Sequence, residues 1–212
     1  MRKPVSVETY IERIKPVLRK VRFSQLKIDD IARYMDISKV TLYKHFATRD
    51  DIISEVVNHY IDYLTEADSA VRDETIPFAE RFRMTYVQSL KCVAYVSDLF
   101  LLDLKESYPN LLEKLMAAQH ARHKQLEVFF TAGMENGIFN PMNGTLFAVQ
   151  DDAVLRRIME PSFCIQYDLT LKQALLDFYQ LKKYQLLKPE YQDSTDDLAM
   201  EREIVQILQS IS

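Results

Sequence analysis

The spacing of hydrophobic residues predicts helices along almost the whole chain. Val7, Ile11, Ile14, Leu18 and Val21 follow one another at steps of three or four residues, which places them on one face of a helix. The same spacing recurs downstream. It predicts further helices near residues 28–35, 39–45, 49–64, 77–96, 99–106, 109–136, 145–160, 171–187 and 198–211. The pattern therefore predicts an all-α protein.

Short polar signals mark where several of these helices begin and end. Ser38 is a predicted N-cap, and Thr48 with Asp51 resembles a capping box in which Asp replaces Glu. Gly137 is the predicted C-cap of the long helix. Pro16 lies inside the first predicted helix, where we expect a kink because proline lacks a backbone N–H. Residues 140–144 read as a loop and residues 191–197 as a mobile polar linker.

The composition is that of a globular protein with few tight turns. The chain has 212 residues, of which 48% are hydrophobic and 27% charged, and only three are glycine. Disordered chains and glycine-rich phosphate loops fit such a composition poorly. The two cysteines, Cys92 and Cys164, have no paired spacing, which is typical of a reducing compartment. No segment predicts a signal peptide or a membrane span, so we expect a cytoplasmic protein without a membrane partner.

Charge divides the chain into a basic beginning and an acidic remainder. Residues 1–50 carry a formal charge of +6 and residues 51–212 carry −10, within a total of −4. A basic segment on an acidic body indicates a polyanionic partner for that segment. We therefore expect two domains, a head of residues 1–50 and a body of residues 51–212.

The head contains the spacing of a helix-turn-helix. The predicted helices at 28–35 and 39–45 are joined by only a few residues, and the second is short enough to enter the major groove of DNA. Leu42 and Phe46 are spaced to face inward. The remaining side chains project outward with a chemistry that suits phosphates and thymine methyl groups. These candidate DNA-binding residues are Lys39, Val40, Thr41, Tyr43, Lys44, His45 and the following Arg49.

We assign expected roles within this set. Tyr43 and Lys44 are expected to bind DNA of any sequence, whereas Val40 and Thr41 are expected to influence which bases are preferred. Lys39 and Arg49 are expected phosphate contacts. At the start of the chain, Arg2 and Lys3 are candidates for an arm over the backbone or minor groove.

The head resembles the DNA-binding domain of the tetracycline repressor (TetR) family across about residues 7–65. The resemblance rests on Ile31-Ala32, Ile37-Ser38, the run from Thr41 to Phe46, and the run from Thr48 to Ile52, which match without a gap. It implies an N-terminal three-helix helix-turn-helix head and a C-terminal helical bundle that binds small ligands and forms dimers. The rest of the chain resembles the family only in length and helical character.

Four positions depart from the pattern of that family. Arg22 stands where the family usually has glycine, Lys27 where a threonine usually caps the second helix, and Val40 where a small residue is frequent. Asp36 replaces the glycine of the turn, and aspartate adopts the left-handed conformation more readily than most residues. A backbone forced left-handed at Arg22 would cost about 1 kcal/mol.

The body offers candidates for a dimer contact and for a ligand pocket. The helices near 145–160 and 170–187 are the expected dimer interface, since Leu171, Leu175, Phe178, Tyr179 and Leu186 form a broad apolar face, with core packing as the alternative. Pocket candidates are Tyr86, Tyr95, His120, Phe163 and Tyr167, together with Phe129 and Phe130, and packing in the core is again the alternative.

No pattern indicates catalysis, a cofactor or a metal. His120 and His123 are three residues apart, but only Glu127 is a further ligand nearby, so a surface or packing role is favoured. No nucleophile motif or phosphate loop occurs in the sequence. We therefore expect a ligand-responsive repressor that binds a palindromic operator as a homodimer. The alternative is a DNA-binding regulator or coactivator controlled by a protein partner, and a helical enzyme that carries such a head is a more distant one.

Overall fold

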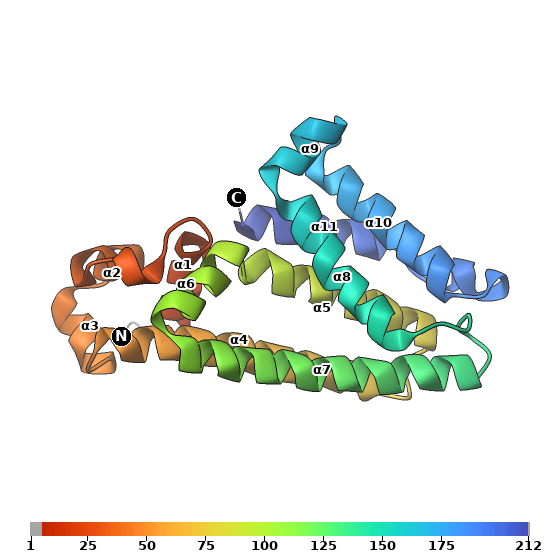
Figure 1. Ribbon diagram of the computed structural model, residues 1–212, viewed down its shortest axis with the longest axis horizontal. Helices are drawn as coiled ribbons and strands as arrows, with labels where there is room; N and C mark the ends of the chain where they lie inside the picture. Colours follow the sequence, from red (N-terminus) through yellow and green to blue (C-terminus); the bar gives the residue numbers. More distant parts are fainter. Residues whose placement is uncertain (1–5, 212) are drawn as a thin grey trace, which may run out of the picture. The chain divides into compact units, whose positions relative to one another are not determined.

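The computed structural model describes residues 6–211, apart from the side chains of residues 66–70. Every regular element in this part of the chain is a helix, and an isolated antiparallel bridge pairs Phe139 with Leu187 (Figure 1). The all-α prediction is confirmed. With η for a 3₁₀ helix, the elements are α1 (Val7–Leu18), η1 (Phe23–Gln25), α2 (Ile28–Tyr34), α3 (Lys39–His45), α4 (Arg49–Arg72), α5 (Phe78–Tyr95), α6 (Asp98–Ser107), α7 (Pro109–Glu135), α8 (Gly144–Met159), α9 (Pro161–Tyr167), α10 (Leu171–Leu186), η2 (Pro189–Ser194) and α11 (Asp197–Ile211).

The helices form two compact units that each combine segments distant in sequence. The first unit comprises residues 1–63 and 95–119, and the second comprises residues 64–94 and 120–212. The long helices α4 and α7 each contribute residues to both units. The division into a head of residues 1–50 and a body of residues 51–212 stays a prediction.

The first unit joins α1, α2 and α3 to α6 through the short η1. Phe23 of η1 is fully buried, and its ring meets the Tyr108 ring edge-on at 6.2 Å. The buried carboxylate of Asp103 accepts hydrogen bonds from both the backbone N–H of Ser24, at 3.1 Å, and the Ser24 hydroxyl. Because these contacts join η1 to residues about 80 positions further along the chain, α6 and the first three helices form one core.

The second unit has a core rich in aromatic rings. Phe82 and Tyr179 stack at 5.8 Å, and Tyr86 meets Tyr179 edge-on at 5.2 Å. Gly133 permits the close approach of Phe139, since a Cβ atom at position 133 would lie 2.1 Å from that ring. Large rings and one close-packed glycine are thus part of a core that also contains many aliphatic side chains.

Most of the predicted helix ends are confirmed. The Ser38 hydroxyl accepts a hydrogen bond from the backbone N–H of Thr41 at 3.0 Å. The backbone N–H of Thr48 donates to the Asp51 carboxylate at 2.7 Å, and the N–H of Asp51 donates to the Thr48 hydroxyl at 3.1 Å. Gly137 follows α7 with a φ of 72°, as expected of a glycine C-cap.

Three features differ from the sequence predictions. The first helix ends at Leu18 instead of Val21, with Pro16 inside it. Residues 161–167 form α9, which has no buried side chain and so no hydrophobic stripe to reveal it. The stretch predicted as a mobile linker includes most of η2, in which Tyr191 packs against the core of the second unit.

The apolar face of α10 belongs to the core of the second unit. Leu175, Phe178, Tyr179 and Leu186 are all buried within a single chain. The alternative of core packing is therefore correct for these residues, and they are not available to a second subunit.

Candidate functional site

The turn between α2 and α3 is held in a single geometry. Asp36 has a φ of 55°, in the left-handed region where a glycine is common, and this lets the backbone N–H of Ile37 donate to the Ala32 carbonyl at 3.0 Å. The Arg13 guanidinium of α1 donates to the Met35 carbonyl at 2.9 Å. The end of α2 is therefore closed from two sides, which fixes the direction in which α3 leaves the turn.

One face of α3 anchors the helix and the opposite face is exposed. Leu42 and Phe46 are buried, as the sequence predicted. Val40 is 69% exposed and Tyr43 54% exposed, and Lys44 and His45 are exposed as well. The side chains on this face of α3 are therefore accessible to a binding partner.

Three candidates of α3 have neighbours within the protein, and one of them is His45, whose ring lies 5.5 Å from that of Tyr10. The Thr41 hydroxyl, half-buried, lies 2.9 Å from the Ser38 hydroxyl. Lys39 pairs with Asp29 of α2 at 2.6 Å, with both side chains largely exposed. A pair of that kind contributes little to stability, so Lys39 can exchange Asp29 for a phosphate at small cost.

Arg49 is oriented by the first unit. Its guanidinium donates to the carbonyl of Phe23 and lies 5.2 Å from the centre of the Phe23 ring. The side chain is half-buried, so its cation is held at the junction of η1 and α4. The candidate arm residues Arg2 and Lys3 lie outside the described residues.

The structure shows how the chain accommodates two of the departures noted in the sequence, Arg22 and Lys27. Arg22 has an extended backbone, with φ −67° and ψ 128°, so no left-handed strain arises there. The carboxylate of Asp30 accepts the backbone N–H of Lys27 at 3.2 Å, which is the bond that the third residue of a helix makes in a capping box. Arg13, which closes the turn, carries no sequence signal that distinguishes it from any other basic residue of an amphipathic helix.

The five ligand candidates are not gathered around one cavity of either unit. Tyr86 is fully buried in the second unit, and its hydroxyl donates to the Leu175 carbonyl at 2.8 Å. Tyr95 belongs to the first unit, where its ring lies 5.0 Å from the Lys15 ammonium. His120 and Tyr167 are exposed, and Phe163 is half-buried with its ring 4.9 Å from that of Tyr167.

The second unit contains a buried ion pair between α8 and α10. The Lys182 ammonium lies 2.8 Å from the Asp151 carboxylate, with both side chains almost fully buried. It also donates to the Phe147 carbonyl at 2.7 Å and to the Gln150 amide oxygen at 3.1 Å. Burial raises the pKa of Asp151 and lowers that of Lys182, and the attraction between the two charges opposes both shifts.

Comparison with solved structures identifies the fold. KstR2 of Mycobacterium tuberculosis, a ketosteroid transcriptional regulator, superposes with a TM-score of 0.62 at 15% identity, over 87% of this chain and 97% of its own. PfmR from Thermus thermophilus, a TetR family transcriptional regulator, gives 0.57 at 17% identity over 82% and 96%. AibR in complex with isovaleryl coenzyme A and operator DNA gives 0.58 at 17% identity, also over 82% and 96%. The chain has the TetR-family fold. No protein-family model and no curated protein matches the sequence.

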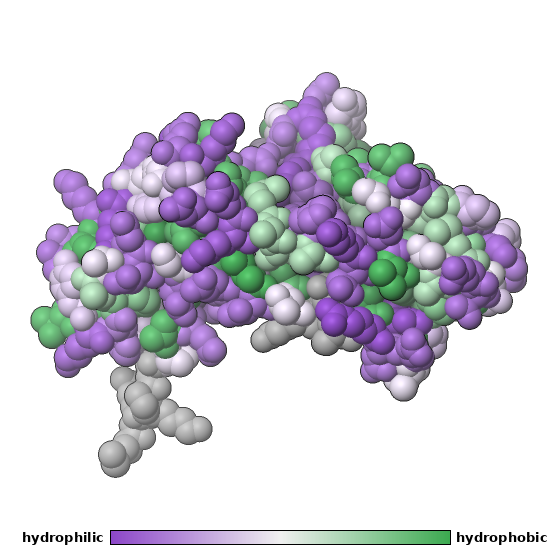
Figure 2. Space-filling view, turned by 60° about the horizontal axis from the view of Figure 1, so that its bottom comes forward, coloured by the Kyte–Doolittle hydropathy of each residue, from purple (hydrophilic) through white to green (hydrophobic). Residues whose placement is uncertain are grey.

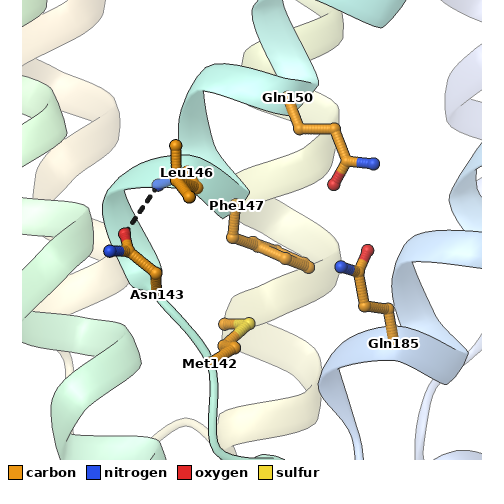
Figure 3. Close-up of a pocket in the computed structure, with 6 residues that line it drawn as sticks. All are labelled: Met142, Asn143, Leu146, Phe147, Gln150 and Gln185. Atoms are coloured by element: carbon orange, nitrogen blue, oxygen red, sulfur yellow. Dashed lines mark hydrogen bonds between the residues drawn. The ribbon is translucent and has the colours of Figure 1, made fainter.

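Within this TetR-family fold, a small pocket opens between α8 and α10. Its volume is about 280 Å³, and its lining residues are Met142, Asn143, Leu146, Phe147, Gln150 and Gln185 (Figure 3). Apolar side chains form one part of the lining and the amides of Gln150 and Gln185 another. Lys182 contacts two of the lining residues, because its ammonium donates to the Phe147 carbonyl and to the Gln150 amide oxygen. Sequence reasoning missed this pocket, because its residues come from two separate helices and a loop.

Exposed apolar side chains occur on several helices of the TetR-family fold. On the face shown in Figure 2, hydrophobic residues lie in separate areas among hydrophilic ones. In the second unit the large exposed side chains include Leu146 and Val149 of α8, Leu181 and Tyr184 of α10, and Ile165 of α9. No helix of the described residues is long and apolar enough to cross a membrane, and no group of three or more possible metal ligands occurs among them.

Proposed function

We propose that this protein is a DNA-binding transcriptional regulator that acts as a homodimer and responds to a small ligand, most simply as a repressor. One observation carries the proposal. The turn and the two buried anchors hold α3 rigidly, while Val40, Tyr43, Lys44 and His45 project from its exposed face. A solved structure of the same fold, AibR, is a complex with operator DNA and a coenzyme A thioester, which supports both DNA binding and a ligand.

The side chains of α3 divide between the DNA backbone and the bases. Lys44 and Tyr43 supply a cation and a hydroxyl for phosphates, and Lys39 joins them once it leaves Asp29. Val40 and Thr41 stand at the start of the helix, which is the part that reaches base edges in helix-turn-helix proteins. Arg49 contacts both the carbonyl and the ring of Phe23. Its contribution to DNA binding therefore includes orienting the head.

A dimer places two heads on a two-fold symmetric operator, and the second unit provides a surface for it. The pocket between α8 and α10 is lined by exposed Leu146, and Val149, Leu181 and Tyr184 are the other exposed apolar residues of these two helices. In a two-fold interface the same surface of both subunits meets, so that surface must contain both protruding side chains and a recess that accepts them. We assign the interface to this surface and not to the buried face of α10.

A ligand would act by changing the separation of the two heads. Helices α4 and α7 contain residues of both units, so a displacement in the second unit passes along them without a break in the chain. The first unit responds as a whole, because the Asp103–Ser24 contact fixes α6 to the head. Operator affinity and ligand affinity are then linked in one equilibrium.

Control by a protein partner is the second candidate, and one observation favours it. Ile165, on the short helix α9, is 83% exposed, and the neighbouring Tyr167 and Leu169 are exposed as well. Three exposed apolar residues within five positions of the chain support a contact with another protein. Loss of partner binding on Ile165→Glu, with DNA binding intact, would favour this candidate.

The decisive experiment selects genomic fragments bound by the purified full-length protein and then tests variants on the strongest fragment. Tyr43→Ala is expected to weaken binding to all sequences, because a phosphate contact carries no base information. Thr41→Ala is expected to change the preferred bases while nonspecific binding persists. Lys124→Ala, on the exposed face of α7, is the matched control and should bind as the wild type does. Absence of any salt-sensitive binding by the wild type would refute the function.

A further inference from the structure

The buried face of α5 carries a row of polar side chains. Thr85, Gln88 and Ser89 are buried and lie at helical spacing on α5, and Arg122 of α7 is buried against them, with 4% of its surface exposed. The Thr85 hydroxyl is satisfied within its own helix, since it donates to the Arg81 carbonyl at 2.8 Å. The feature that needs an explanation is the Arg122 cation, because a buried charge is far more costly than a buried neutral polar group.

Arg122 has no anionic partner among the described side chains. Its guanidinium donates to the Ser89 hydroxyl at 2.9 Å and, weakly, to the Gln88 amide oxygen at 3.4 Å, and both acceptors are uncharged. Its Nε atom is buried without a hydrogen-bond partner, and no carboxylate of the described side chains pairs with it. Burial of an unpaired charge is costly, so an anion bound next to Arg122 would stabilise the protein.

The acidic side chains near Arg122 form ion pairs with other cations. Asp151 is a buried acid on which the charge of Arg122 acts, but its direct ion pair is with Lys182, at 2.8 Å, and Asp152 pairs with Arg156 at 3.0 Å. Burial, and then the charge of Arg122, lowers the pKa of His123, which is therefore neutral near pH 7. The buried groups Arg122, Asp151 and Lys182 together carry one excess positive charge.

We propose that Arg122, with Ser89 and Gln88, binds the carboxylate of a small organic acid. The guanidinium presents parallel N–H donors that match a carboxylate, and the excess charge equals that of a single carboxylate and not of a phosphate dianion. The Gln88 side chain is the group that would move aside to admit the carboxylate. Its amide makes only two long hydrogen bonds, each of 3.4 Å, to Arg122 and to the Leu64 carbonyl. The inference rests on the proposed ligand response and names the chemical class of the effector.

The test compares acids with uncharged analogues on the full-length protein. The probes are the straight-chain carboxylates from butanoate to decanoate, and benzoate, each set against its own primary amide at equal concentration. We expect at least one acid to raise the melting temperature of the wild type while its amide does not, since only the acid neutralises Arg122. In Arg122→Met the affinity for that acid should fall about tenfold to a hundredfold, the usual cost of losing a charged hydrogen bond.

Control variants separate a binding role from a structural one. Arg122→Lys keeps the charge and should retain part of the acid response, and Lys124→Met removes an exposed charge from the same helix and should retain all of it. An equal response of the wild type to acids and amides, or an undiminished acid response in Arg122→Met, would overturn the proposal. If Arg122→Met does not fold, the acid-amide comparison on the wild type and on Arg122→Lys still decides. Salt-sensitive DNA binding by the wild type without additives tests the proposed function separately.

Discussion

Two side chains of opposite charge, Asp151 and Lys182, meet in the interior of the second unit. Loss of one partner leaves the other charge buried and unpaired, which is far more costly than the absence of both. We expect Asp151→Asn to lower the free energy of unfolding by about 3–5 kcal/mol. Adding Lys182→Met to that variant should restore most of the loss, because the remaining buried cation is then removed.

Urea unfolding of the wild type, both single variants and the double variant measures this coupling as a cycle. The ion pair would be of little consequence if Asp151→Asn unfolded at the same urea concentration as the wild type. The expectation about coupling would be wrong if the double variant were less stable than Asp151→Asn alone.

At the residue scale, contacts between a side chain and the backbone a few positions away could be predicted from the sequence. Contacts between residues far apart in the sequence could not. Ser38, the Thr48–Asp51 pair and the left-handed Asp36 follow from rules about neighbouring positions. The contact of Arg49 with Phe23 joins residues 26 positions apart, and the sequence alone suggested a free phosphate contact instead. Long charged side chains find their partners through the tertiary fold, which local patterns do not contain.

At the element scale, helix α10 shows why an apolar stripe does not identify its partner. The spacing of Leu175, Phe178, Tyr179 and Leu186 correctly predicted a buried face, but that face is buried within one chain. The exposed side of the same helix carries Leu181 and Tyr184, two residues that are too few to form a periodic signal. Helix α9 escaped prediction for the same reason, because none of its side chains is buried.

This reassignment predicts how α10 variants behave. Leu181→Glu places a charge on a residue that is 67% exposed, so the protein should fold normally but dissociate to monomers if α8 and α10 form the interface. Leu198→Glu on α11 is a matched control, with the same change at a residue that is also 67% exposed, and should remain a dimer. Phe178→Glu should instead prevent folding, because it buries a charge in the core.

Analytical ultracentrifugation gives the oligomeric state of these variants, and circular dichroism gives their helical content. A dimeric Leu181→Glu variant would exclude this surface. A Leu198→Glu variant that dissociates would move the interface to α11.

At the scale of the whole molecule, the uneven charge controls the approach to DNA. The first 50 residues carry a formal +6 against −10 for the remainder, so the acidic part repels the DNA backbone while the basic part is drawn to it. The described cations of α3, Lys39 and Lys44, stand on the exposed surface of the first unit. Sequence composition was sufficient to find this asymmetry, because net charge depends on no contact.

The charge asymmetry leads to a quantitative expectation for salt. Each phosphate neutralised by the protein adds about −0.9 to the slope of log affinity against log salt concentration, because counterions are released from the DNA. Lys44→Ala removes one cation from each head, so in a dimer the slope should become shallower by about 2. Fluorescence anisotropy with one operator fragment over a series of potassium chloride concentrations measures the slope, and Lys124→Ala should leave it unchanged. A slope unaffected by Lys44→Ala would show that this lysine does not meet a phosphate, and a change of about 1 in place of about 2 would show that a single head binds.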